Sequence, residues 1–373
     1  MIIGFDAKRA YFNTTGLGNY SRTLIRSLSE NFPENEYKLF TPKESNLFPI
    51  HPYKNMSIHT PQNFPGTFFK SAWRSAWMVK DLEREKADIF HGLSHEIPKG
   101  IQYTNIKSVV TIHDLIHERF PDQYPALDRK IYNNKFRFAC EHAHKIIAIS
   151  EQTKKDIVEI YGINPEKIEV IYQSADEKYL QRFSEEEKNN FKDIYQLPDQ
   201  FFLSVGSIIE RKNLLQTVKA IQQTKDVKLV VLGDGKEYKE KVKKYITGNN
   251  LSDRVIFLNE KHKIKTEELP LLYQSSKGLI YISSYEGFGL PVLEGILSGI
   301  PVIAANTSSL PEAGGKCAVY VEPKDISELS NAIEKINLLI DLTDVAKSEY
   351  QHHISLFREE NMASNVMNLY KKL

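Results

Sequence analysis

Two glutamates in an otherwise apolar stretch are the side chains best suited to chemistry. Residues 285–305 read YEGFGLPVLEGILSGIPVIAA, which places Glu286 and Glu294 eight positions apart around a glycine-rich turn. An ionised carboxylate only accepts hydrogen bonds, so such a pair suits a ligand rich in hydroxyl groups, of which sugars are the obvious class. The alternative is that Glu286 interacts with a helix dipole and that Glu294 is solvated.

The turn between the two glutamates should begin a helix. The run KGLIYIS reads as a buried strand, and a helix is expected near Gly289 with Pro291 in its first turn. Glu286 then precedes a helix N-terminus, whose backbone N–H groups favour an anion or several hydroxyl oxygens. The N–H groups concerned belong to Gly287, Phe288, Gly289 and Leu290. Glu294, about one turn further, needs either a ligand or a buried donor.

A pair of cations follows the strand that opens the second half of the chain. The run FFLSVG ends at Gly206, and the adjacent Arg211 and Lys212 precede a helix expected near Asn213. Two cations at a strand end indicate a phosphate, because a hydrogen bond to a charged group contributes about 1.5–3 kcal/mol. Taken alone, an Arg-Lys pair is most often a solvated surface feature.

Two further turns in the first half of the chain carry candidate residues. In FDAKRAYFNTTGLGNY, Gly16 and Gly18 permit a backbone turn close to a diphosphate, with a helix expected from about Asn19. The third glycine of a dinucleotide-binding fingerprint is missing, which argues against NAD. The run SVVTIHD ends in His113 and Asp114, a polar pair at the carboxyl end of a strand.

Two pairs of histidines are spaced four residues apart, which raises the question of a metal site. The pairs are His91 with His95 and His113 with His117. Neither pair belongs to a His-Glu-x-x-His motif, so no metal site is expected.

Short apolar runs alternate with amphipathic helical patterns along the chain, which predicts an α/β fold with two doubly wound parallel sheets. The first domain is expected over residues 1–180 and the second over 198–350, joined by a polar, charged stretch. A helix over 355–373 could cross back to the first domain. Ligands of such sheets bind beyond the carboxyl ends of the strands, where the candidate residues lie.

Composition limits the partners and the compartment. The net charge of +1, with 26% charged residues, argues against a duplex nucleic-acid binder. Two cysteines are typical of a reducing compartment, and no apolar run reaches the roughly 20 residues of a membrane span, so a cytoplasmic protein is expected. The helical pattern over 67–86 places Phe69, Trp73 and Trp77 on one face near cations. That face is either part of the core or a peripheral contact with the inner face of a membrane.

Six segments together resemble glycosyltransferase family 4, retaining enzymes of the GT-B fold that use nucleotide-sugar donors. In chain order they are TGLGNY, TIHDLIHERFPDQY, IIAISEQTKKDI, VGSIIERKN, VVLGDG and YEGFGLPVLEGILSGIPVIAA. The resemblance implies two Rossmann-like domains facing a central cleft. It also implies transfer of a hexose, mannose or glucose, from a nucleotide-diphosphate sugar to a saccharide or polyprenyl-linked saccharide acceptor in cell-surface polysaccharide synthesis. Neither a metal nor another cofactor is implied.

The resemblance also assigns roles in the donor site. Glu286 would contact hydroxyls of the donor sugar together with the amides that follow it, and Glu294 would hold the ribose hydroxyls. Arg211 and Lys212 would bind the diphosphate beside Gly206.

Residues of the other domain complete the implied site. Gly16 and Gly18 would line the diphosphate, and His113 would face the donor sugar near the reacting carbon. Ser150 and Asp114 are weaker candidates on the acceptor side.

Other activities stay open at this point. A sugar-nucleotide epimerase or phosphorylase of the same architecture would share the donor site. A glycoside hydrolase would use Glu286 and Glu294 as an acid–base pair. A non-catalytic sugar-nucleotide binder would keep the phosphate and ribose contacts. One departure from the resemblance is Asn213, since the resemblance implies that glycine is frequent at this position.

Overall fold

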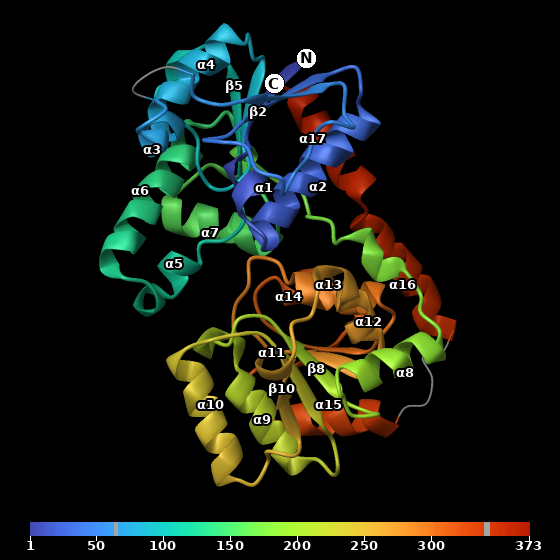
Figure 1. The fold of residues 1–373 in the computed structure, drawn as a ribbon. Helices are drawn as coiled ribbons and strands as arrows, with labels where there is room; N and C mark the ends of the chain where they lie inside the picture. The colour runs from blue at the N-terminus through green and yellow to red at the C-terminus, as the bar shows by residue number, and fades with distance from the viewer. Residues whose placement is uncertain (63–65, 339–343) are drawn as a thin grey trace. The chain divides into compact units, whose positions relative to one another are not determined.

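The chain folds into two compact units (Figure 1). The computed structural model describes every residue except 63–65 and 339–343. Unit 1 comprises Met1–Ser174 together with Phe357–Leu373, and unit 2 comprises Ala175–Leu356. Each unit has its own sheet and is described by itself.

These limits differ from the expected ranges 1–180 and 198–350. The stretch between those ranges belongs to unit 2, where residues 185–194 form a helix. Its N-terminus is a capping box in which the Ser184 hydroxyl accepts from the Glu187 N–H. A segment that appears in sequence as a polar linker is therefore an ordered surface helix.

The sheet of unit 1 has seven parallel strands in the order β3-β2-β1-β4-β5-β6-β7. The strands are β1 (Ile2–Asp6), β2 (Glu36–Phe40), β3 (Met56–His59), β4 (Ile89–Gly92), β5 (Lys107–Ile112), β6 (Lys145–Ala148) and β7 (Ile168–Val170). The α-helices are α1 (Lys8–Phe12), α2 (Gly16–Asn31), α3 (Lys70–Ala72), α4 (Met78–Arg84), α5 (Ile116–Arg119), α6 (Ala126–His142), α7 (Glu151–Tyr161) and α17 (Glu359–Lys371). The shorter turns are the π-helical η1 (Trp73–Trp77) and the 3-10 turns η2 (Ile101–Tyr103), η3 (Pro121–Gln123) and η4 (Pro165–Lys167).

The sheet of unit 2 has six parallel strands in the order β10-β9-β8-β11-β12-β13. The strands are β8 (Phe202–Val205), β9 (Leu229–Leu232), β10 (Val255–Phe257), β11 (Gly278–Tyr281), β12 (Val302–Ala305) and β13 (Val319–Val321). The α-helices are α8 (Glu185–Ile194), α9 (Leu214–Gln223), α10 (Glu237–Gly248), α11 (Leu258–Lys261), α12 (Leu269–Gln274), α13 (Leu290–Leu297), α14 (Leu310–Gly314), α15 (Ile326–Leu338) and α16 (Asp344–Leu356). The 3-10 turns are η5 (Glu177–Leu180), η6 (Glu210–Lys212), η7 (Thr266–Glu268) and η8 (Gly315–Cys317).

The apolar runs expected as strands form β1 and β5 to β12, which confirms the doubly wound α/β class. Strands covered on both faces read as nearly continuous apolar runs, and β11, GLIY, is buried at every residue. The strands β2, β3, β4 and β13 complete the two sheets.

The C-terminal helix packs in unit 1. Figure 1 shows α17, in red, beside the blue α2, and an ion pair of 2.5 Å joins Arg26 Nη2 to Glu359 Oε2. The Tyr370 hydroxyl lies 2.6 Å from His91 Nδ1 inside the unit. One helix is expected over 355–373. In the structure the preceding helix, α16, ends at Leu356, and α17 begins at Glu359.

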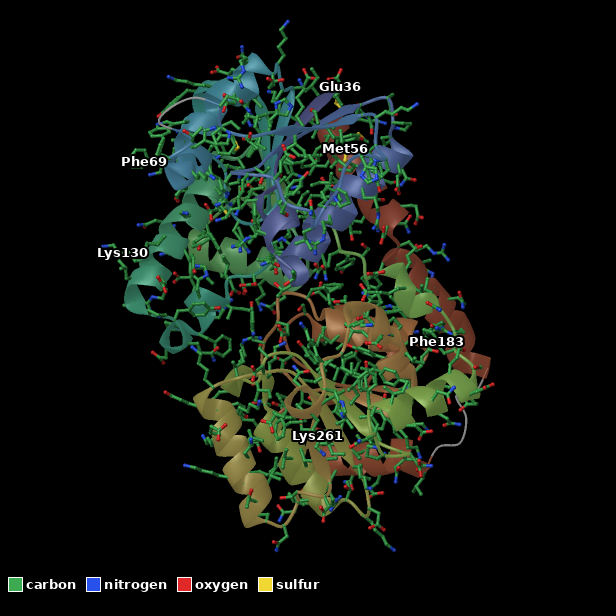
Figure 2. All side chains as sticks on the ribbon, in the orientation of Figure 1. Glu36, Met56, Phe69, Lys130, Phe183 and Lys261 are labelled. Carbon is green, nitrogen blue, oxygen red and sulfur yellow. The ribbon has the colours of Figure 1, made fainter. Side chains whose placement is uncertain are left out.

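The stretch 67–86 is not one regular helix. A π-helical turn, η1, separates α3 from α4, and Trp73 is buried at 3% exposure with its indole N–H donating to Asp81 Oδ2 at 2.6 Å. Trp77 and Phe69 are 39% and 60% exposed, and Phe69 lies at the outer edge of unit 1 (Figure 2). The expected single face of three aromatic rings is therefore wrong, because Phe69 lies before the helix and the π-helical turn changes the angular spacing between Trp73 and Trp77.

Within the described part of the chain, no helix has both the length and the apolar character that a membrane crossing requires.

Candidate functional site

Two neighbouring strands of unit 2 lead to the predicted donor-site residues. Strands β8 and β11 pair in parallel, with Leu203 opposite Leu279, so the loops at their carboxyl ends leave the sheet side by side. The loop after β8 leads to η6, which contains Arg211 and Lys212, and the loop after β11 contains Glu286. Three charged side chains from two distant parts of the sequence therefore lie together.

Glu286 forms an ion pair with each of the two cations. Arg211 Nη1 lies 2.9 Å and Lys212 Nζ 3.4 Å from Glu286 Oε1, and the side chains of Arg211, Lys212 and Glu286 are 8%, 17% and 13% exposed. The buried Nε of Arg211 has no hydrogen-bond partner among the described residues. Two positive charges and one negative charge leave this cluster net positive, which favours an anionic ligand.

Burial and charge pairing act in opposite directions on the cluster. Burial by itself raises the pKa of Glu286, but Lys212 and Arg211 outweigh it, so the pKa lies below its ordinary value. Burial lowers the pKa of Lys212, and the Glu286 carboxylate opposes that shift. Glu286 is therefore ionised at neutral pH and can accept hydrogen bonds from a ligand.

Hydrogen bonds between the two loops position Arg211. The Ser284 N–H donates to the Arg211 carbonyl at 2.7 Å, and the Arg211 guanidinium donates to the Tyr285 carbonyl. Asn213 has a φ of +55°, and its side-chain amide donates to the Ile282 carbonyl at 2.9 Å. Asparagine tolerates the left-handed region better than most residues, so Asn213 can adopt this backbone conformation at low cost.

Gly206 allows Lys212 to lie against the end of β8. Its φ is +111°, and a Cβ atom there would lie 2.8 Å from Lys212 Nζ. The neighbouring loop is equally close, since a Cβ at Gly233 would lie 1.9 Å from the Gly206 carbonyl oxygen. Glycine is needed at both positions for this approach.

A tyrosine that the sequence reasoning missed belongs to the same cluster. The Tyr281 hydroxyl donates to Glu286 Oε1 at 2.9 Å and accepts from Lys212 Nζ at 2.7 Å. Lys212 Nζ also lies 4.9 Å from the centre of the Tyr281 ring. The available signal was a tyrosine at the last position of an apolar strand, directly before a candidate loop.

Glu294 lies in α13 and is half-buried, with a tyrosine as its hydrogen-bond donor. The Tyr273 hydroxyl donates to Glu294 Oε2 at 2.7 Å. Burial raises the pKa of Glu294, and hydrogen bonds from Tyr273 and Tyr179 act against that rise. Glu294 is therefore not a solvated surface side chain, and its charge helps to raise the pKa of Lys212 against the effect of burial.

The turn that follows Glu286 is tightly packed. Gly289 has a φ of +120°, and a Cβ there would lie 2.6 Å from Leu310 Cδ2. Phe288 is 2% exposed, and its carbonyl accepts from Ser309 Oγ at 2.7 Å. Helix α13 begins at Leu290, one residue after the expected start, and the Glu286 N–H donates to Ser308 Oγ at 3.0 Å.

In unit 1, the two predicted glycines lie inside a helix and not before it. Helix α2 begins at Gly16, three residues earlier than expected, so Gly16 and Gly18 belong to its first turn. Gly18 is buried, and a Cβ there would lie 1.8 Å from the Asn13 carbonyl oxygen. Gly18 thus permits close packing of the preceding loop, whereas Gly16 is exposed.

His113 follows β5 and is held in one tautomer. Its Nε2 lies 2.9 Å from the Leu93 carbonyl, which can only accept, so Nε2 carries the proton. Burial lowers the pKa of His113 to about 4, so the ring is neutral at physiological pH. The His113 ring also packs edge-on against Tyr20, with centroids 4.7 Å apart. The remaining nitrogen, Nδ1, is thus an acceptor.

The two acceptor-side candidates have local structural partners. Asp114 Oδ1 accepts from the Ile116 N–H at 3.1 Å at the start of α5. Ser150 is the N-cap of α7, and its hydroxyl accepts from the Thr153 N–H at 3.0 Å. The Thr153 hydroxyl donates to the His113 carbonyl at 3.2 Å, so this cap supports the segment that carries His113.

A chain of ion pairs in unit 1 was not predicted from the sequence. Arg74 Nη2 lies 2.6 Å from Asp6 Oδ2, and Arg74 Nη1 lies 3.0 Å from Glu96 Oε2, which Lys135 Nζ also contacts at 3.0 Å.

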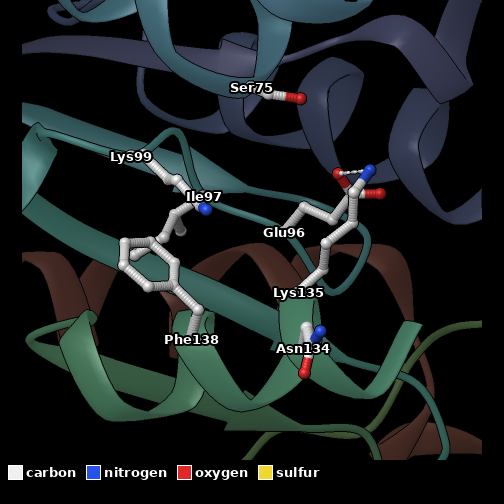
Figure 3. Close-up of a pocket in the computed structure, with 7 residues that line it drawn as sticks. All are labelled: Ser75, Glu96, Ile97, Lys99, Asn134, Lys135 and Phe138. Carbon is white, nitrogen blue, oxygen red and sulfur yellow. Dashed lines mark hydrogen bonds and ion pairs between the residues drawn. The ribbon is translucent and has the colours of Figure 1, made fainter. Parts of the chain in front are cut away.

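Figure 3 shows Glu96 and Lys135 at the edge of a pocket with a volume of about 80 Å³. The pocket is lined by Ser75, Glu96, Ile97, Lys99, Asn134, Lys135 and Phe138. Its size suits a single small group.

The four-residue spacing of the two histidine pairs could also suit a metal site. Over residues 1–62, 66–338 and 344–373, no group of three or more His, Cys, Asp or Glu side chains could hold a metal ion. Both ring nitrogens of His91 already have partners, namely the hydroxyls of Tyr370 and Thr111.

Comparison with protein-family models gives two matches, one in each half of the chain. The model described as "Glycosyl transferases group 1" matches residues 185–343, and "Glycosyltransferase Family 4" matches residues 14–179. The matches lie largely within unit 2 and unit 1, respectively.

Curated relatives include enzymes of O-antigen synthesis. The chain is 25% identical to O-antigen chain mannosyltransferase B of Escherichia coli, over 100% of both chains. It is 29% identical to the O-antigen chain mannosyltransferase RfbU of Salmonella typhimurium, over 69% of this chain and 68% of that protein.

Solved structures with similar folds cover the full chain. A glycosyltransferase from Rickettsia africae superposes with a TM-score of 0.75 at 19% identity, over 100% of this chain and 97% of that chain. The Anabaena protein HepE in complex with UDP gives a TM-score of 0.74 at 16% identity, over 100% and 99%. At these identities the similarity establishes the GT-B fold.

Proposed function

Because the chain belongs to the group 1 glycosyltransferases of family 4, and is a hexosyltransferase of polysaccharide biosynthesis, we propose that it transfers a mannosyl residue. The donor is a nucleoside diphosphate sugar, the acceptor is a saccharide, and the anomeric configuration is retained. Mannose is favoured over glucose because the two relatives described above are both mannosyltransferases.

The observation that carries the donor part of this proposal is the cluster of Arg211, Lys212 and Glu286 at the ends of two paired strands. One cluster offers cations for a diphosphate and a carboxylate for sugar hydroxyls, only a few ångströms apart. The buried Nε of Arg211 supports a bound anion, because a buried donor without a partner is costly unless a ligand supplies one.

The proposed reaction assigns no covalent role to either glutamate. The bond between the anomeric carbon and the diphosphate oxygen breaks with its electron pair on that oxygen, and the acceptor hydroxyl forms the new bond from the same face. The hydroxyl proton passes to the leaving diphosphate. Arg211 and Lys212 stabilise the negative charge that grows on the diphosphate, and Glu286 orients the sugar by accepting from its hydroxyls.

Residues of unit 1 have supporting roles in this proposal. The neutral His113 accepts a hydrogen bond from a donor-sugar hydroxyl through Nδ1, because its Nε2 is occupied by Leu93. Gly16 and Gly18 belong to the part of α2 assigned to the diphosphate, and Asp114 and Ser150 to the acceptor side. These assignments follow the roles that the family resemblance implies for the matching positions.

Glu294→Gln tests the ribose assignment. We expect one of UDP, GDP, ADP and dTDP to raise the melting temperature of the wild type, since a ligand at about 100 times its Kd adds about 2.7 kcal/mol. The variant should lose most of this shift, because an amide replaces one acceptor oxygen with a donor. Burial raises the pKa of Glu294 above its ordinary value of 4.5, and protonation of this carboxylate removes an acceptor. Nucleotide binding should therefore begin to weaken on acidification before the pH reaches 4.5.

Glu240→Gln, an exposed change on α10, is the matched control and should keep the full shift. A folded wild type that none of the four nucleotides stabilises would contradict the donor site. Sugar conjugates of the nucleotide that binds then identify the donor by transfer to a saccharide acceptor, and NMR of the new linkage reads its anomeric configuration.

A polyprenyl-linked acceptor and contact with the inner face of a membrane form the remaining part of the proposal. Phe68 and Phe69 are 78% and 60% exposed at the start of the 67–86 stretch, beside Lys70. Aromatic rings with an adjacent cation favour an anionic lipid surface. We expect the protein to cosediment with anionic vesicles and the double variant Phe68→Ser, Phe69→Ser to stay in solution. Leu338→Ser, at another exposed apolar residue, should bind as the wild type does, and equal binding by all three proteins would refute the contact.

A further inference from the structure

Tyr281 connects the two functional parts of the donor cluster. Its side chain is 4% exposed at the carboxyl end of β11, and its hydroxyl lies 2.7 Å from Lys212 Nζ and 2.9 Å from Glu286 Oε1. The direct distance between Lys212 Nζ and Glu286 Oε1 is longer, at 3.4 Å. The hydroxyl is thus the closest partner of the ammonium within this group of three side chains.

The chemistry of the three groups fixes the direction of both hydrogen bonds. An ionised carboxylate only accepts and an ammonium only donates, so the hydroxyl gives its proton to Glu286 and receives one from Lys212. Both bonds involve a charged partner, which makes them stronger than bonds between neutral groups. Moving either charged side chain therefore costs one of these two bonds.

We propose that Tyr281 is a positioning residue for sugar transfer, whose hydroxyl holds Lys212 and Glu286 at a fixed separation. This inference rests on the proposed function, in which Lys212 binds the diphosphate and Glu286 the sugar. The bond that breaks lies between those two parts of the donor. A fixed separation of the two side chains therefore orients the sugar relative to its leaving group, and preorganised charges of this kind favour the transition state.

The alternative is that Tyr281 only fills space in the core. Its neighbours in β11, Leu279 and Ile280, do so without polar atoms. Arg211 does not depend on Tyr281, because the guanidinium is held by the carbonyl of Tyr285. A role in packing alone would leave Tyr281→Phe close to the wild type, because phenylalanine keeps the ring.

Tyr281→Phe should lower kcat/KM for the nucleotide sugar by about tenfold to a hundredfold, the value of one or two hydrogen bonds to charged groups. The fall should lie mainly in kcat, because the charged groups remain available to bind the ground state. Tyr320→Phe is the matched control, since the Tyr320 hydroxyl donates at 2.7 Å to the Gly315 carbonyl, away from the cluster. A kcat/KM of Tyr281→Phe within twofold of the control would overturn the proposal.

The pH profile of kcat/KM separates positioning from packing. Charged groups facing the hydroxyl are Lys212 and Arg211 from η6, Glu286 from the loop and Glu294 from α13. Losing the hydroxyl removes a bond to the charged form of both neighbours, so the pKa of Glu286 rises and that of Lys212 falls. The pH range over which the variant keeps its maximal kcat/KM should therefore be narrower than in the wild type. Its acid limb should lie at higher pH and its alkaline limb at lower pH. Unchanged limbs would count against the proposal.

A double-mutant cycle with Lys212→Ala completes the test. In that background Tyr281→Phe should cost a smaller factor in kcat/KM than in the wild type, because the hydroxyl no longer holds an ammonium. An equal factor in both backgrounds would overturn the positioning role. If Lys212→Ala itself keeps full activity, the proposed donor site fails. If Lys212→Ala is impaired while Tyr281→Phe is not, only the inference about Tyr281 fails.

Discussion

Lys212→Ala should lower kcat/KM for the nucleotide sugar by about a hundredfold in a protein that remains folded. Lys212 is one of two cations paired with Glu286, and its side chain is 17% exposed, so water replaces its charge poorly. Loss of one preorganised contact to charge that develops in the transition state costs about 2.7 kcal/mol, which corresponds to roughly a hundredfold in rate. Initial rates at several donor concentrations measure this effect.

Lys244→Ala on α10 is the control for this prediction. Lys244 is exposed, so its removal changes the net charge of unit 2 by the same amount without touching the cluster. The control should keep wild-type kinetics. Near wild-type turnover by Lys212→Ala would remove this residue from the diphosphate site. Melting curves of both variants establish that any loss of rate is not a loss of fold.

The parts of the fold that could be predicted are those with a strong local signal. Strand β5, KSVVTI, combines the β-branched residues Val109, Val110 and Ile112 with Thr111, and the structure has this strand over Lys107–Ile112. Strand β4, IFHG, has the same buried environment but contains His91, whose polar ring is compensated by Tyr370 from the far end of the chain. A compensation that depends on a residue 279 positions away has no local signature.

The residues of the candidate site also differ in how far the sequence alone predicts them. Arg211, Lys212 and Glu286 could be predicted because charged residues at strand ends stand out against apolar runs. Tyr281 could not, since an aromatic residue in a strand is ordinarily part of the core. Its function depends on the pairing of β8 with β11, which brings Lys212 to its hydroxyl.

Interrupted and capped helices account for the remaining differences. Hydrophobic spacing predicts a continuous helix over 67–86, but a π-helical turn at Trp73–Trp77 rotates the side chains that follow. Ser150 follows a strand as a site residue would, and the structure uses its hydroxyl as the N-cap of α7. A serine at this point of an α/β unit serves a cap or a ligand equally well on sequence grounds.

Glu286→Gln should have the largest effect on turnover, lowering kcat by a hundredfold or more. The amide keeps the shape of the side chain but removes the charge that pairs with Arg211 and Lys212, and it replaces an acceptor of sugar hydroxyl protons with a donor. Exposed controls at other glutamates, such as Glu240→Gln, should not affect kcat. A Glu286→Gln variant with more than a tenth of wild-type kcat would refute the assignment.

The same substitution should reduce stability in a way that depends on pH. The folded-state pKa of Glu286 is lowered, so its ionised form stabilises the fold above the ordinary value of 4.5, and this contribution disappears as the pH falls through the lower folded value. At neutral pH the variant leaves two cations without their carboxylate, and its melting temperature should be below that of the wild type. The difference should shrink below pH 4.5. A constant difference across that range would mean that Glu286 stabilises the fold by packing and not by charge.

Comparing the two glutamate variants also distinguishes transfer from hydrolysis. In a transferase, Glu294→Gln should weaken nucleotide binding, whereas Glu286→Gln should leave the nucleotide bound and lower the rate of sugar transfer. In a hydrolase that uses the two carboxylates as an acid–base pair, both changes would abolish turnover of a simple glycoside and neither would alter nucleotide affinity. The separate partners of the two carboxylates, cations for Glu286 and tyrosines for Glu294, are the physical reason to expect the first result.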